Sequence, residues 1–131
     1  MEKVTLIIDS NYLCYRSMLR MAEFSYDQRP TGVIFGFLRQ IQTLAERFDY
    51  PDFIFCWDSV ESYRKQAYPD YKKRSEEKDP NTIKIFQEGK PQFRIIRVEV
   101  LPKLGFFNNF IQRGLEADDM IAEVAKLHDD V

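Results

Sequence analysis

Short apolar runs alternate with amphipathic segments along this chain. Two of the runs, Val4 to Ile8 and Phe53 to Trp57, are rich in β-branched and aromatic residues, and each is followed directly by an acid. Such runs predict buried strands. A third strand is predicted from Phe106 to Gln112. All three strands therefore lead into polar segments at their carboxyl ends.

Helices are predicted between these strands. Apolar residues at helical spacing indicate helices from Tyr12 to about Met21, from Thr31-Gly32 to the break at Pro51, and from about Glu116 to about Leu127. A loop is expected from Asp27 to Pro30. The stretch Pro91 to Leu104 fits either an alternating strand or a helix, and its place between two other elements favours a helix. This alternation of strands and helices predicts an α/β domain with a parallel sheet.

The composition is that of one globular domain. The chain has 131 residues, 44% hydrophobic and 31% charged, and no apolar run approaches the roughly 20 residues of a membrane span. The N-terminus lacks the apolar core of a signal peptide. Cys14 and Cys56 form no metal or redox motif, so we expect reduced thiols in a cytoplasmic protein.

Acids follow the predicted strand ends. Because ligands bind beyond the carboxyl ends of parallel strands, these acids are expected to converge on one crevice. Crowded carboxylates repel unless cations neutralise them, and Mg²⁺ prefers oxygen ligands. Taken singly, each acid could instead cap a helix. As a set they predict a divalent-metal site made of Asp9, Asp58, Glu116, Asp118 and Asp119.

A basic, aromatic segment follows Asp58. Cations pair with phosphates and aromatic rings stack on unpaired bases, which is the combination that binds single-stranded nucleic acid. The alternative is a solvated surface helix with its tyrosines packed inward. The residues concerned are Arg64, Lys65, Lys72, Lys73 and Arg74, interleaved with Tyr63, Tyr68 and Tyr71.

Together these motifs resemble the family of 5′-3′ exonucleases and flap endonucleases, which includes the 5′-nuclease domain of bacterial DNA polymerase I and phage exonucleases. The resemblance runs through nearly all of the chain. It rests on five ordered motifs: Leu6 to Asn11, Pro30 to Leu38, Trp57-Asp58, Tyr63 to Lys72, and Gly114 to Asp119.

The resemblance implies a PIN-like α/β fold and a structure-dependent nuclease of DNA replication and repair. It implies two Mg²⁺ or Mn²⁺ ions held by the five acids, with Asn11 supporting Asp9. An arch over about 61–90 would admit DNA with a single-stranded 5′ end or flap. Arg64 and Lys72 would steady the scissile phosphate, and Tyr68 and Tyr71 would orient nucleotides or pack inside the arch.

The family's next elements are a strand with further metal-binding aspartates and a helix-three-turn-helix that grips duplex DNA. Neither occurs in residues 1–131, so the second metal site is expected to be incomplete. The chain would then be a fragment, half of a split enzyme completed by a second polypeptide, or a remnant. Two other functions stay open: a PIN-type ribonuclease, and a non-catalytic DNA-binding or assembly module.

Overall fold

A three-stranded parallel sheet forms the centre of the computed structural model, which describes residues 3–59 and 79–127. Its strands are β1 (Thr5–Asp9), β4 (Asp52–Trp57) and β5 (Asn109–Ile111), in the order β1-β4-β5. Thr5 pairs with Asp52 and Phe55 pairs with Asn109. The carboxyl ends of all three strands therefore lie at one edge of the sheet.

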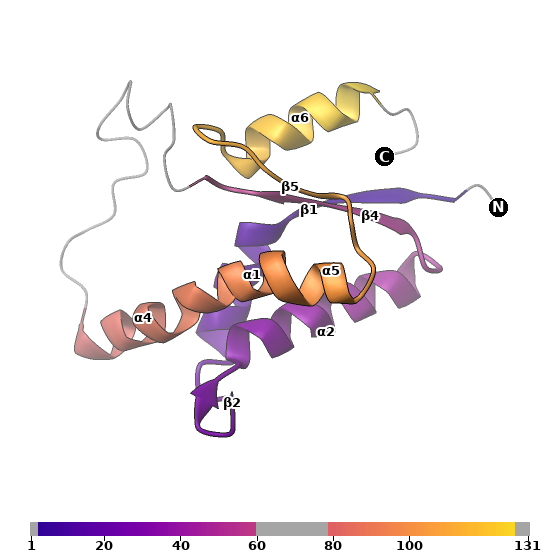
Figure 1. Ribbon diagram of the computed structural model, residues 1–131. Coiled ribbons are helices and arrows are strands. Elements are labelled where there is room, and N and C mark those ends of the chain that lie inside the picture. Colours follow the sequence, from indigo (N-terminus) through magenta and orange to yellow (C-terminus); the bar gives the residue numbers. More distant parts are fainter. Residues whose placement is uncertain (1–2, 60–78, 128–131) are drawn as a thin grey trace.

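Helices cover both faces of this sheet (Figure 1). One face carries α6 alone, and the other carries α1, α2, α4 and α5. A hairpin of two short strands joins α1 to α2. The bounds are α1 (Ser10–Arg20), β2 (Ser25–Tyr26), β3 (Arg29–Pro30), α2 (Gly32–Arg47), α4 (Pro80–Ile95), the π-helical segment η1 (Ile96–Val100), α5 (Leu101–Lys103) and α6 (Ala117–Leu127).

Alternation along the strands divides the core in two. Phe53, Phe55 and Trp57 of β4 face the core beneath α1, α2 and α4, whereas Ile54 and Cys56 face α6. A strand places successive side chains on opposite faces, so a continuously apolar strand is buried on both sides. This is why the run from Phe53 to Trp57 has no polar position.

Gln92 fastens α4 to the start of α2. The Thr31 side chain makes no capping hydrogen bond. The buried Gln92 Oε1 instead accepts from the backbone N–H groups of Val33, at 2.9 Å, and of Ile34, at 3.2 Å. The first turn of a helix has N–H groups without helical partners, and this side chain satisfies two of them. The contact fixes α4 across α2.

The three predicted strands and the predicted helices are present, and the segment Pro91 to Leu104 is helical. The third strand is shorter than predicted, and the loop at Asp27 to Pro30 is part of the β2–β3 hairpin. Residues 80–90, which the sequence placed in the arch region, form the first turns of α4. Residues 60–78 lie outside the described residues. No helix in the described part of the chain is long and apolar enough to cross a membrane.

Candidate metal and phosphate site at the sheet edge

Asp9 stands where β1 ends and α1 begins. Its side chain accepts a hydrogen bond of 3.2 Å from the backbone N–H of Tyr12, so it is the N-cap of α1. The capping role that the sequence left as an alternative is therefore present for this residue. Capping engages one carboxylate oxygen and leaves Asp9 at the carboxyl edge of the sheet, half-buried.

Asp58 connects three elements at the same edge. Its backbone N–H donates to Asn11 Oδ1 at 2.8 Å, which ties the end of β4 to the start of α1. Its side-chain Oδ1 accepts from the backbone N–H of Ala117 at 2.6 Å, at the start of α6. The N-terminus of α6 thus points at a carboxylate, which its dipole favours. The side chains of Asn11 and Asp58 are thus each held by a backbone N–H group.

Glu116 and the two aspartates that follow it open α6. Gly114, with φ at 84°, turns the chain from β5 toward this helix in a conformation that favours glycine. Glu116 is 5% exposed, and its N–H donates to Asp119 Oδ2 at 3.0 Å. Asp118 is exposed in the first turn. Asp119 lies three residues after Glu116, and this hydrogen bond places its carboxylate beside the Glu116 backbone.

A cavity of about 470 Å³ lies between these acids and the helix α4. Asp58 and Glu116 line one side, beside Asn11. Three cations from α4 and η1 also line the cavity: Lys90, Arg94 and Arg97. A cavity lined by both carboxylates and cations suits a substrate that carries phosphate and is held with a metal cation.

These three cations are not among the site residues predicted from the sequence. Their signal was available, because Lys90, Arg94 and Arg97 recur at intervals of four and three residues and so share one helical face. Lys90 is held in place by aromatic rings: its Nζ lies 4.4 Å from the ring centroid of Tyr15 and 5.2 Å from that of Phe93, and it donates to the Tyr15 hydroxyl. Asn109 orients the Arg97 backbone by donating to its carbonyl at 2.7 Å.

The donor chemistry fits a hard divalent cation, but the acids do not gather into one compact cluster. Within residues 3–59 and 79–127, no three carboxylate, thiol or imidazole side chains lie close enough together to hold a metal. Asp58 and Glu116 alone line the cavity among the five acids. The basic and aromatic residues predicted to bind nucleic acid lie outside the described residues: Arg64, Lys65, Tyr68, Tyr71, Lys72, Lys73 and Arg74.

An open parallel α/β sheet with its polar cavity beyond the strand ends is the layout of proteins that bind phosphate-bearing ligands at that edge. Comparison with known families defines the chain further. It belongs to the family of the 5′-3′ exonuclease N-terminal, resolvase-like domain, whose model matches residues 4–130. The resemblance drawn from the motifs is confirmed.

Relatives carry the same description. The chain is 28% identical over 127 residues to the 5′-3′ exonuclease of Buchnera aphidicola and 31% identical over 126 residues to that of Aquifex aeolicus. The first comparison covers 95% of this chain and 41% of the relative, the second 95% and 40%. The chain thus spans about two fifths of the length of these relatives.

A solved structure has the same fold. It is a pseudo-enzyme–product complex of the bacteriophage T5 flap endonuclease with DNA and metal ions. The likeness has a TM-score of 0.59 at 26% identity and covers 94% of this chain and 43% of that one. The α/β fold predicted from the sequence is confirmed.

Proposed function

We propose that this chain is the metal-binding N-terminal part of a 5′-nuclease that hydrolyses phosphodiester bonds in DNA with a free 5′ end or flap. The observation that carries the proposal is the family match over residues 4–130, combined with the acids after the strands of the sheet, of which Asp58 and Glu116 line one cavity. DNA and metal ions are present in the T5 neighbour, which supports the same substrate and cofactor class here. We assign the protein to the cytoplasm on its free cysteines.

The proposed ligands of Mg²⁺ or Mn²⁺ are Asp9, Asp58, Glu116, Asp118 and Asp119. Divalent cations at such a site supply activation of the attacking water and stabilisation of charge on the phosphate. Further acids would come from the rest of a longer chain or from a second polypeptide. Asn11 holds the Asp58 backbone at the cavity.

Cations of the chain would balance the phosphate. Lys90, Arg94 and Arg97 line the same cavity as Asp58 and Glu116 and would bind the oxygens of the scissile phosphate. From the segment after Asp58 we propose Arg64 and Lys72 as arch cations that steady the same phosphate, with Lys65, Lys73 and Arg74 gripping the strand and Tyr68 and Tyr71 orienting nucleotides.

A non-catalytic DNA-binding or assembly module is the second candidate. It is favoured by one observation: within the described part of the chain, no three potential ligands form a metal cluster. In that case the hydrogen bonds of Asp9, Asp58 and Asp119 to backbone N–H groups would be their whole role. Metal-dependent turnover separates the two functions.

The test is cleavage of a 5′-flap DNA by the purified chain in Mg²⁺ or Mn²⁺, with Asp9→Ala beside it. Cleavage that requires the metal and is lost in the variant supports the nuclease. The same assay is repeated with the C-terminal part of a curated relative added in trans. Absence of cleavage in both settings, with the chain folded, would show that this chain is not a nuclease part.

A further inference from the structure

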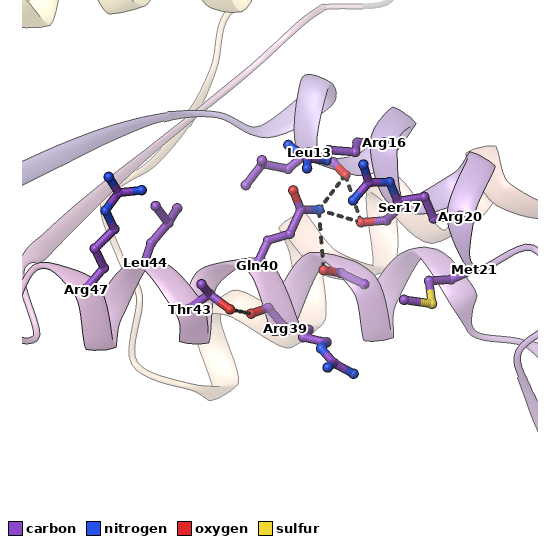
Figure 2. A pocket seen from close by; sticks show the side chains of 11 residues that line it. Leu13, Arg16, Ser17, Arg20, Met21, Arg39, Gln40, Thr43, Leu44 and Arg47 are labelled. Carbon is purple, nitrogen blue, oxygen red and sulfur yellow. Dashed lines mark hydrogen bonds between the residues drawn. The ribbon is translucent and has the colours of Figure 1, made fainter.

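A second polar cavity lies away from the acids, between α1 and α2 (Figure 2). Its volume is about 450 Å³. Four arginines line it, Arg16 and Arg20 from α1 and Arg39 and Arg47 from α2, and none of its lining residues within the described part of the chain is an acid. We call this cavity and its rim the arginine groove. In a chain with a net charge of −2, such a concentration of one sign of charge selects an anionic ligand.

The groove arginines are available for a ligand. All four are exposed. Between the described residues the ion pairs are Lys3–Asp52, Lys84–Glu88 and Lys126–Glu123, and none of them involves the groove. Arg47 only stacks over Phe48, with its guanidinium carbon 5.8 Å from the ring centroid.

The floor of the groove is rigid and polar. Gln40 Nε2 donates to the Leu13 carbonyl at 3.1 Å and to Ser17 Oγ at 2.8 Å, and Ser17 Oγ donates to the same carbonyl, also at 2.8 Å. Gly36 allows the two helices to approach, because a Cβ there would lie 2.6 Å from the Cβ of Ser17. The arginines therefore project from a fixed pair of helices.

The spacing of the arginines suits an extended polyanion. Figure 2 shows Arg20 and Arg47 at opposite ends of the groove, with Arg16 and Arg39 between them. Arg39 and Arg47 are eight residues apart on α2, and Arg20 lies near the start of that helix. At the helical rise per residue the cations span about 20 Å. That length corresponds to about six base pairs of duplex DNA.

We propose that the arginine groove binds the sugar–phosphate backbone of double-stranded DNA, as a contact separate from the acid-lined cavity. Single strands are held by aromatic stacking platforms, and no aromatic residue among those the structure describes lines the groove. Duplex backbone is instead bound by cations and polar groups. Arg16 lies seven residues after Asp9 on α1, so duplex in the groove extends beside the proposed active site. The proposal rests on the proposed nuclease function for its ligand class.

The test is fluorescence anisotropy of a blunt 20-base-pair DNA duplex with the purified chain in Ca²⁺-free and Mg²⁺-free buffer, over a series of salt concentrations. The variant Arg20→Gln/Arg39→Gln/Arg47→Gln is compared with Lys84→Gln/Lys103→Gln/Lys126→Gln, which removes the same charge from other surfaces. We expect the groove variant to bind duplex at least 10-fold more weakly at moderate salt. Its slope of log affinity against log salt should be less steep by about 2.7, for three lost phosphate contacts.

Circular dichroism and thermal melting establish that both triple variants are folded. A gain-of-function variant, Thr43→Lys, adds a cation between Arg39 and Arg47 and should tighten duplex binding severalfold. Equal affinity of the two triple variants, together with no tightening by Thr43→Lys, would overturn the proposal. An equal loss for a 20-nucleotide single strand would overturn the assignment to duplex.

The outcome for the groove can be distinguished from the outcome for the proposed nuclease function. The binding assay contains no divalent metal, so it measures the groove whether or not the chain can cleave DNA. Groove-dependent duplex binding without any metal-dependent cleavage would support the groove and count against the nuclease. Metal-dependent cleavage, together with duplex binding that the groove variant does not weaken, would support the nuclease and count against the groove.

Discussion

The side-chain Oδ1 of Asn11 accepts a hydrogen bond from the backbone N–H of Asp58, at 2.8 Å, across 47 residues of sequence. This bond joins the first turn of α1 to the end of β4, where the proposed metal ligands Asp9 and Asp58 stand. The partner is a backbone group, so Asn11 fixes the backbone position of Asp58 rather than the rotamer of its carboxylate. It is therefore a positioning residue in the proposed site.

Asn11→Ala should lower kcat for cleavage of 5′-flap DNA by about 10–100-fold, the effect common for groups that orient metal ligands. The cause is that Asp58 loses its fixed position. Asn11→Asp keeps an acceptor oxygen at the same place and should recover part of the loss. The measurement is single-turnover cleavage at saturating Mg²⁺.

Asn108→Ala is the matched control for Asn11→Ala, because Asn108 is exposed and adjoins β5. It should cleave as the natural chain does. If Asn11→Ala and Asn108→Ala cleave equally fast, Asn11 has no positioning role. If Asn11→Ala is less stable than the natural chain in urea and this instability accounts for its slower cleavage, Asn11 again has no positioning role.

Arg94→Gln should raise KM for flap DNA by about 10-fold, because a hydrogen bond between a charged donor and phosphate contributes about 1.5 kcal/mol or more. Arg94 lines the same cavity as Asp58 and Glu116. Lys84→Gln changes a cation on the same helix outside this cavity and should leave KM unchanged. Steady-state kinetics at one fixed salt concentration decide the matter, and equal KM values for both variants would remove Arg94 from the substrate site.

The sheet could be predicted from local pattern because β1 and β4 contain apolar runs, Leu6 to Ile8 and Phe53 to Trp57, each followed directly by an acid. The beginning of α4 was harder. Asp79 caps it and Pro80 stands at its first position, both standard start signals, yet its first turns are mostly polar and its interior contains Gly89 and Pro91. Its packing comes from long-range contacts such as Gln92 with Val33, which no local pattern contains.

The common edge of the sheet at which Asp58 and Glu116 lie could be predicted from the sequence, but the contacts around them could not. The topology that brings Asp58 and Glu116 to one cavity follows from acids placed after parallel strands. The hydrogen bond from Ala117 to Asp58 depends on how β5 turns into α6, and that turn is set by tertiary packing. The cations of α4 required knowing which helical face meets the cavity. The spacing of these cations in the sequence shows that they share one helical face, but not which part of the protein that face contacts.

Gln92→Met should destabilise the fold by about 2 kcal/mol. Methionine keeps the volume and removes the acceptor, so the N–H groups of Val33 and Ile34 lose their partner at the buried start of α2, and a buried donor left unsatisfied costs about 1–3 kcal/mol. Gln87→Met, at an exposed position of α4, should change stability little. Urea unfolding followed by circular dichroism measures both. Equal midpoints would mean that Gln92 does not cap α2.

Asp79 makes the start of α4 sensitive to acid. Hydrogen bonds from the Thr82 backbone N–H and hydroxyl lower the pKa of Asp79. A lowered folded-state pKa means that the capping contribution is present above the unfolded value and is lost as pH falls through the folded value. The difference in melting temperature between the natural chain and Asp79→Ala should therefore shrink on acidification below the ordinary aspartate range. A difference that stays constant down to strongly acidic pH would contradict the cap.

Cys56 should make the fold less stable in alkaline solution. Burial, and then the negative charge of Asp9, raise the pKa of the Cys56 thiol from 9.0 to about 11. The unfolded chain therefore loses this proton first as pH rises, and the stabilisation present below pH 9.0 is lost progressively up to about 11. One proton corresponds to at most about 1.4 kcal/mol per pH unit. The measurement is the free energy of unfolding in urea across this pH range, with Cys56→Ala as reference because it shares all other titrating groups. The natural chain should lose stability more steeply than Cys56→Ala, and parallel curves would show that the thiol does not titrate differently in the folded state.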